Sequence, residues 1–237
     1  MGLLDFFKRK QDLTKVTNQK SKINNFLKNI YFDENDELFK KGFKEVQGSA
    51  GTFLIKEHDI EEITETIIFK DGFLQKYFFK KDGKINGWYC SLNIRDIDSS
   101  YGVDGFVFSL TEGLFINNKE EGEWKDCLFY RGKKYKVEII CNYKNGELDG
   151  FEEQYNDRLN TLEQGELIFK TEYSKGKKHG KCIQYSTYSP WSGHKGGFPV
   201  DIEYWEEDEF KYGTKFDVLD GKKLNDYHDL SIKNNCR

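Results

Sequence analysis

The side chains that most often carry chemistry are few in this sequence of 237 residues, and they lie far apart. The four histidines, His58, His179, His194 and His228, show no HxH or HxxxH spacing, so no two of them form a typical metal-binding pair. The five cysteines include no CxxC pair, which argues against a zinc site and against a disulfide framework. The sequence therefore predicts no metal site and no cofactor.

Two pairs of carboxylates stand at alternate strand positions, Asp96 with Asp98 and Asp201 with Glu203, and could in principle chelate a hard cation. Such pairs more often form a solvated strand face. No GxxxxGK[ST] phosphate loop and no GxSxG nucleophile elbow is present. We therefore predict no catalytic residues and no enzyme activity, and a hydrolase or nuclease with a scattered site is the alternative.

An acidic run with two aromatic residues is the strongest candidate for a binding site. Six of the nine residues from Asp201 to Glu209 are Asp or Glu. The irregular stretch that precedes this run holds both prolines of the chain, and irregular loops often carry function. Aromatic residues recur as interface anchors. We predict a partner-binding site made by Tyr204, Trp205, Glu206, Glu207, Asp208, Glu209, Trp191 and His194. The alternative is a solvated acidic edge strand that discourages aggregation.

Charge is unevenly distributed along the chain. The net charge is −4, but residues 1–30 carry seven Lys or Arg against Asp5 and Asp12, a balance of +5 that leaves −9 for the remainder. A dense set of carboxylates attracts basic partners, whereas a phosphate backbone requires clustered Lys and Arg. We therefore expect a basic protein partner for the acidic body and no direct binding of nucleic acid.

One short pattern is written twice between Tyr135 and Tyr185. Apolar or aromatic residues alternate with polar residues, which is typical of a strand, and the runs close on Asn145-Gly146 and Lys175-Gly176. Glycine supplies the positive φ that a two-residue hairpin turn requires. The pattern predicts β-hairpins with structural turn glycines at Gly83, Gly87, Gly122, Gly146, Gly150, Gly176, Gly180 and Gly213.

Residues Asn118–Asp126, Tyr143–Gly150 and Tyr173–Gly180 resemble the MORN repeat, and more closely its bacterial variant. The resemblance covers about Asp82 to Val218. It implies a mainly β fold, an antiparallel meander of stacked hairpins forming an elongated curved sheet or a half-barrel. Some bacterial proteins built from the variant are antitoxin or immunity components, so the resemblance implies a non-catalytic protein that occludes a basic toxin.

The N-terminal segment differs from the rest in charge and periodicity. Residues 1–30 are expected to form one or two short helices, because Ile23, Phe26, Leu27 and Ile30 lie on one helix face, while residues 31–237 form the β-repeat domain. These helices either cover the edge strand of the sheet or, through residues 1–10, bind an anionic membrane surface as part of a scaffold. With no membrane span or signal peptide in the sequence, we expect a cytoplasmic protein, peripheral at the inner membrane face in the second case.

Overall fold

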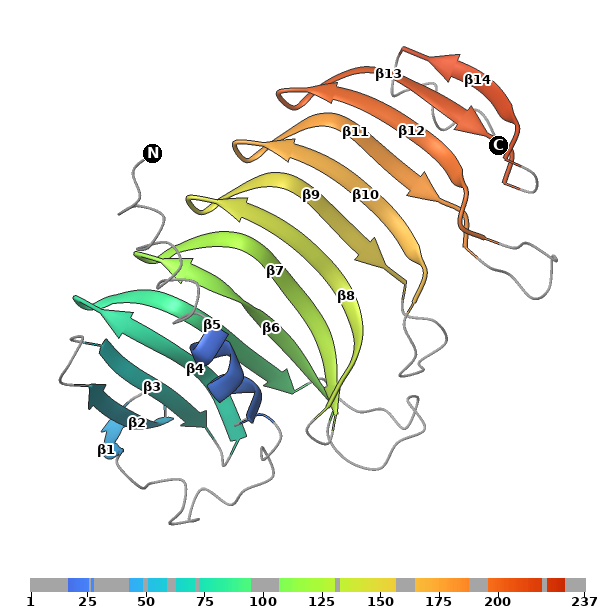
Figure 1. The fold of residues 1–237 in the computed structure, drawn as a ribbon. Coiled ribbons are helices and arrows are strands. Elements are labelled where there is room, and N and C mark those ends of the chain that lie inside the picture. The colour runs from blue at the N-terminus through green and yellow to red at the C-terminus, as the bar shows by residue number, and fades with distance from the viewer. Residues whose placement is uncertain are drawn as a thin grey trace. The chain divides into compact units, whose positions relative to one another are not determined.

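The computed structural model describes residues 17–25, 27, 43–48, 51–58, 63–70, 73–94, 107–130, 133–156, 165–187, 196–218 and 221–228. Fourteen strands form one open sheet in which each strand is hydrogen bonded to its neighbours in the sequence (Figure 1). One short helix, comprising residues 17–25 and 27, is present among the described residues. The predicted antiparallel meander of β-hairpins is therefore confirmed.

The strands run from the N-terminal to the C-terminal end of the sheet in chain order. Their bounds are β1 Lys44–Gly48, β2 Gly51–His58, β3 Ile63–Lys70, β4 Phe73–Lys81, β5 Lys84–Ile94, β6 Val107–Ile116, β7 Lys119–Tyr130, β8 Lys133–Lys144, β9 Glu147–Tyr155, β10 Leu167–Ser174, β11 Lys177–Tyr185, β12 Pro199–Glu206, β13 Glu209–Phe216 and β14 Lys223–Tyr227.

Contacts divide the chain into two compact units, which are described separately. Unit one comprises Met1–Asp98, Asp104–Glu121 and Leu128–Lys134. Unit two comprises Ser99–Val103, Gly122–Cys127 and Tyr135–Arg237. The helix belongs to unit one, and the described elements of unit two are all strands of the sheet.

Five hairpins are closed by two-residue turns in which both turn residues have a positive φ. This is the geometry of a type I′ turn, whose twist matches that of the flanking strands. The turn pairs are Asp82-Gly83, Asn117-Asn118, Asn145-Gly146, Lys175-Gly176 and Glu207-Asp208. Three of these turns were predictable from the sequence, because they have glycine at the second position. The Glu207-Asp208 turn carries no glycine and was read as part of a strand and binding site.

The second glycines of the repeat lie inside strands and not in turns. Gly87, Gly150 and Gly180 each have a positive φ at a bulge, where the strand carries two more residues than its partner. Gly122 in β7 has a φ of +70°. Gly213 instead lies against an aromatic ring. The repeat therefore encodes turns with its first glycine and bulges with its second.

Each of three turns is hydrogen bonded to the preceding hairpin, at the start of that hairpin's second strand. Asn118 donates from its backbone N to Ile85 O (2.9 Å), and its side-chain Oδ1 accepts from Ile85 N (2.6 Å). Asp208 makes the same two contacts with Lys178, at 3.0 and 2.8 Å. Gly176, which has no side chain, donates from its backbone N to β9 at 2.8 Å. A side-chain oxygen at the second turn position thus adds a tie between successive hairpins.

The helix packs onto the face of the unit-one sheet. Ile23 and Leu27, two residues of the predicted apolar side, are 0% and 1% exposed, whereas Phe26 and Ile30 lie outside the described residues. Gln19 Oε1 accepts a hydrogen bond from Trp88 N at the bulge formed by Gly87 (3.1 Å). The helix therefore satisfies a backbone donor that the bulge removes from the sheet ladder.

Polar contacts place this helix over β3, β5 and the start of β8. Lys22 Nζ lies 3.7 Å from Glu65 Oε2, and Lys134 Nζ donates to Asn24 Oδ1 at 3.3 Å. The contacts lie on the sheet face and not along the edge strand β1, where the helices were expected to act as a cover. Residues 1–10, on which the membrane alternative depends, lie outside the described residues.

Candidate functional site

The predicted site lies at the tip of the hairpin formed by β12 and β13. Glu206 ends β12, Glu207 and Asp208 form the turn, and Glu209 begins β13. We call Glu206–Glu209 the acidic turn. Trp191 and His194, the other predicted contributors, lie outside the described residues. Their part in the site therefore stays a prediction.

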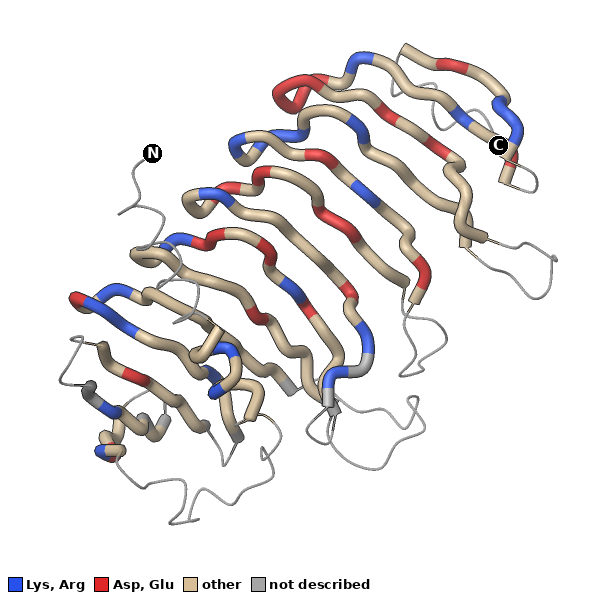
Figure 2. Tube along the Cα trace, in the orientation of Figure 1, with Lys and Arg blue, Asp and Glu red and all other residues tan. Residues whose placement is uncertain are grey.

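Lysines of the same chain face the carboxylates of the acidic turn. Figure 2 shows the acidic turn beside the lysine-containing turn between β10 and β11. Lys177 Nζ, from the neighbouring β11, lies 3.3 Å from Glu207 Oε2. Lys211 Nζ lies 3.3 Å from Glu206 Oε2 and 2.9 Å from Glu209 Oε2. The hydrogen bond from Lys211 lowers the pKa of Glu209, and the same contact raises the pKa of Lys211. Much of the charge that the sequence concentrates here is balanced within the chain.

The two aromatic residues of the predicted site point to opposite sides of the sheet. Tyr204 stacks on Tyr212, with ring centroids 4.3 Å apart and an interplanar angle of 19°. Trp205 lies on the other face, where its Nε1 donates to Glu203 Oε2 at 3.0 Å. Adjacent strand residues alternate between faces. Tyr204 and Trp205, which the sequence prediction placed in one site, therefore lie on different faces of the sheet, and their binding role stays a prediction.

A second candidate surface lies on the Trp205 side of unit two. Residues directly opposite each other on paired strands share a face, and so do residues two apart along a strand. One cross-strand row from β8 to β14 comprises Cys141, Glu152, Thr171, Cys182, Glu203, Gly213 and Tyr227. The aromatic-acidic face, as we call this surface, is formed by Trp124, Asp126, Cys141, Tyr143, Glu152, Thr171, Tyr173, Cys182, Asp201, Glu203, Trp205 and Tyr227. Two lysines share this face, Lys178 opposite Tyr173 and Lys215 opposite Asp201.

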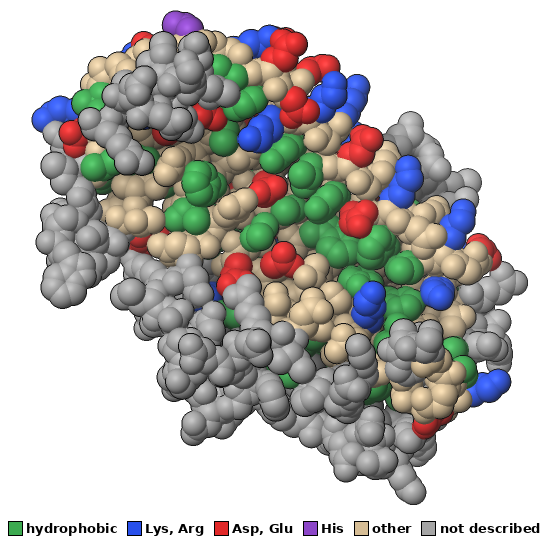
Figure 3. Space-filling view, turned by 180° about the vertical axis from the view of Figure 1, so that it is seen from behind, with side chains coloured by type: hydrophobic (Ala, Val, Ile, Leu, Met, Phe, Trp, Pro, Cys, Tyr) green, Lys and Arg blue, Asp and Glu red, His purple; other side chains and the backbone are tan. Residues whose placement is uncertain are grey.

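Aromatic rings lie next to this cross-strand row, on the side nearer the hairpin turns. Trp124 meets Tyr143 edge to face, with ring centroids 6.2 Å apart. Lys178 Nζ lies over the Trp205 ring, 4.8 Å from its centroid. Tyr143, Tyr173 and Trp205 are all half-buried, so part of each ring remains accessible. Figure 3, which is turned by 180° from the view of Figure 1, shows hydrophobic side chains gathered with carboxylates among them.

Two carboxylates of this face are buried and held by aromatic hydrogen-bond donors. Asp201 is 5% and Glu203 is 7% exposed. The Tyr227 hydroxyl donates to Asp201 Oδ1 at 2.6 Å and lies 3.3 Å from Glu203 Oε1. Burial, together with the hydrogen bond to Asp201, raises the pKa of Tyr227. The phenol therefore remains a donor that fixes both acids at neutral pH.

The negative potential of the face is visible in its other titratable groups. Burial, and then the charges of Glu152 and Asp126, raise the pKa of the Cys141 thiol to about 12. Burial and the charge of Glu152 likewise raise the pKa of Tyr173 to about 12. Carboxylates on different strands thus act on common neighbours, and the face favours positively charged ligands.

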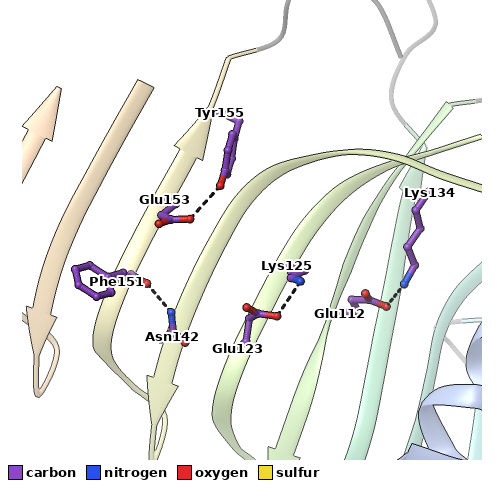
Figure 4. A network of polar contacts seen from close by, with 8 residues as sticks. All are labelled: Glu112, Glu123, Lys125, Lys134, Asn142, Phe151, Glu153 and Tyr155. Atoms are coloured by element: carbon purple, nitrogen blue, oxygen red, sulfur yellow. Dashed lines mark hydrogen bonds and ion pairs between the residues drawn. The ribbon is translucent and has the colours of Figure 1, made fainter. Parts of the chain in front are cut away.

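The opposite face of unit two has a different charge arrangement (Figure 4). Glu153 accepts hydrogen bonds from Lys170 Nζ at 2.8 Å and from the Tyr155 hydroxyl at 3.0 Å. The bond from Lys170 lowers the pKa of Glu153. Lys170 Nζ also lies 4.1 Å from the centroid of the Phe151 ring. On this face, Lys170 therefore contacts both the Glu153 carboxylate and the Phe151 ring.

Sequence reasoning missed most of the aromatic-acidic face because its members come from seven strands. Period-two alternation was a usable signal, since it separates Tyr204 from Trp205 and joins Trp205 to Glu203. The pairing between strands was not readable, because the bulges shift the register.

Histidines and metal-binding groups add no further site among the described residues. His179 and His228 are exposed, and the His228 ring lies 6.2 Å from that of Tyr212. Within the described ranges, no group of three or more His, Cys, Asp or Glu residues is placed to hold a metal ion. In the same ranges, the helix is too short and too polar to traverse a lipid bilayer.

The resemblance to the MORN repeat stays a prediction. The hairpin meander it implied is present, whereas the antitoxin or immunity role stays a prediction. No protein-family model, curated protein or solved structure significantly matches this chain.

Proposed function

We propose that this chain is a non-catalytic protein-binding module whose partner contacts the aromatic-acidic face. The observation that carries the proposal is a set of half-buried aromatic rings beside carboxylates, on a sheet that no second layer of described residues covers in unit two. Aromatic rings supply interface area at low entropic cost, and charges set orientation and partner choice. Such a surface is suited to binding another macromolecule.

Charge favours a basic protein as the partner. The chain beyond residue 30 carries a net charge of −9. In the most specific form of the proposal, the protein is an immunity- or antitoxin-like factor of the cytoplasm. It would occlude the cationic surface with which a toxin, such as a nuclease, engages nucleic acid. The acidic turn would contribute long-range attraction, since its side chains are exposed, while the aromatic-acidic face would make the contact.

Photo-cross-linking in the native cell tests this proposal. A photoreactive residue replaces Tyr173 on the aromatic-acidic face or, as the matched control, Phe151 on the opposite face, where the side chain is 41% exposed. We expect a specific cross-linked protein from position 173 and not from position 151. That protein, once purified, should form a stoichiometric complex with the intact chain. The absence of a cross-link at 173, or of a reconstituted complex, would contradict the proposal.

Two alternatives stay predictions. A membrane-surface scaffold depends on residues 1–10, and co-sedimentation of the intact chain and of a chain lacking these residues with anionic vesicles tests it. Of the two predicted helices, the one that the structure describes buries Ile23 and Leu27 against its own sheet, which leaves them turned away from any lipid. A hydrolase or nuclease would be indicated by toxicity when the chain is expressed alone.

A further inference from the structure

We propose that the aromatic-acidic face binds an extended polypeptide segment rich in lysine and arginine, and that this segment crosses strands β9 to β12. The inference rests on the proposed binding function and adds its recognition mode. An extended segment can place every second side chain against the sheet, and its cationic groups can meet carboxylates and rings in turn.

The spacing of the carboxylates suits such a segment. Glu152 in β9 and Glu203 in β12 belong to one cross-strand row, three strand steps apart. Strands lie about 4.8 Å apart, so the two positions are separated by about 14 Å. An extended chain advances about 3.4 Å per residue, and residues four apart therefore match this separation. Both would point to the same side of the segment.

The rings beside the row are placed to receive cationic side chains. Tyr173 in β10 lies between the two carboxylate strands, and Trp205 in β12 lies beside Glu203. The contact of Lys178 with the Trp205 ring, at 4.8 Å, shows that this ring accepts an ammonium group. A partner lysine or arginine would meet the same chemistry at Tyr173 and Tyr143.

Burial makes these carboxylates more effective than those of the acidic turn. Glu152 is half-buried, and Glu203, which is 7% exposed and contacted by Trp205 Nε1 and the Tyr227 hydroxyl, would act on a bound cation through its electric field. The Glu207 side chain is 71% exposed, and Lys177 already faces it. Charges partly removed from solvent interact more strongly and are less screened by salt. The aromatic-acidic face should therefore determine specific affinity, and the acidic turn should affect mainly the encounter rate.

A charged peptide titration tests the recognition mode. The probe is a fluorescein-labelled peptide of about 12 residues with lysine at every fourth position and Ser or Gly between, which matches the spacing above. Fluorescence anisotropy at about 50 and 300 mM NaCl follows its binding to the intact chain. Glu152→Gln is the test variant, and Glu207→Gln removes the same charge from the acidic turn as the matched control. Near-UV circular dichroism verifies that both variants are folded.

We expect Glu152→Gln to weaken binding about five-fold and Glu207→Gln to change it by less than about two-fold. A chain lacking residues 1–16 tests whether the chain's own basic segment also binds this face. Tighter peptide binding after this deletion would show that the segment competes with the peptide. Equal weakening by both variants, or no binding by either the intact or the shortened chain, would overturn the inference. If position 173 still cross-links a partner in that case, the binding function stands without this recognition mode.

Discussion

The acidic turn and the aromatic-acidic face of unit two differ in how their charges are held. In the acidic turn, four acidic residues follow one another in the sequence, yet Lys177 and Lys211 approach three of them and the side chains remain exposed. On the face, carboxylates from separate strands lie among aromatic rings. Charge density along the sequence is therefore a poor guide to charge available for a partner.

The difference has a physical cause in the hairpin meander. Successive turns lie beside one another, so a basic turn at Lys175–Lys178 neutralises the acidic turn that follows it. Cross-strand rows instead bring together residues about thirty positions apart, such as Glu152 and Cys182, by register alone. The first arrangement stabilises the sheet, and the second forms a surface.

The largest effect is expected at the tightest packing of the face. A Cβ at Gly213 would lie 2.2 Å from Tyr227 Cζ, so Gly213→Ala must displace the ring and break its hydrogen bond to Asp201. We expect a loss of about 3 kcal/mol in the free energy of unfolding, measured by urea denaturation. Gly83→Ala is the control: its Cβ meets open space, and left-handed strain alone costs about 1 kcal/mol. Equal losses would show that Tyr227 packing contributes little.

Removal of one hydroxyl on each face gives the next comparison. Tyr227→Phe deprives the buried Asp201 of its donor and should lower the free energy of unfolding by about 2 kcal/mol. Tyr212→Phe on the opposite face, where the side chain is 40% exposed, should change it by less than about 0.5 kcal/mol. Thermal and urea unfolding of both variants measure this contrast. A neutral Tyr227→Phe would mean that the acids of the face are held by other groups.

Much of the architecture was predictable because turns and alternation are local. Asn145-Gly146 and Lys175-Gly176 close hairpins where the sequence placed them. Glu207-Asp208 was missed because neither residue usually adopts a positive φ. The described helix contacts β3, β5 and β8 and not the edge strand, and helix periodicity could not show this, because it indicates that Ile23 and Leu27 are buried but not against which strands. The face itself depended on bulges at Gly150 and Gly180, whose register shifts no local pattern specifies.

Alkaline pH should destabilise the protein through the face. The pKa values of Cys141 and Tyr173 are raised to about 12, above those of the same groups in the unfolded chain. Groups of this kind contribute their full stability below the unfolded pKa and lose it as the pH rises through the folded pKa. We expect the free energy of unfolding to decline from about pH 9 upward, by on the order of 1 kcal/mol by pH 11 after allowance for solvent screening. Urea titrations at successive pH values measure the decline, and Tyr227→Phe should reduce it. A flat profile would argue against a carboxylate-rich, partly buried face.

The smallest effect is expected in the acidic turn. Glu207→Gln removes an exposed ion pair with Lys177 and should change the free energy of unfolding by less than about 0.5 kcal/mol. Glu203→Gln, which alters a buried acid bonded to Trp205 and Tyr227, should have a larger effect. Parallel urea denaturation of the two variants measures the difference. A larger loss for Glu207→Gln than for Glu203→Gln would show that the acidic turn, and not the aromatic-acidic face, holds its carboxylates more tightly.

The four tryptophans allow the most direct test of the binding face. A chain labelled with 5-fluorotryptophan is titrated with the lysine peptide, and the ¹⁹F signals of Trp88, Trp124, Trp191 and Trp205 are followed by NMR. The aromatic-acidic face predicts that the Trp124 and Trp205 signals shift while Trp88, which lies against the helix of unit one, does not. Shifts confined to Trp88 or Trp191, or no shift at Trp124 and Trp205 while the peptide is bound, would contradict it.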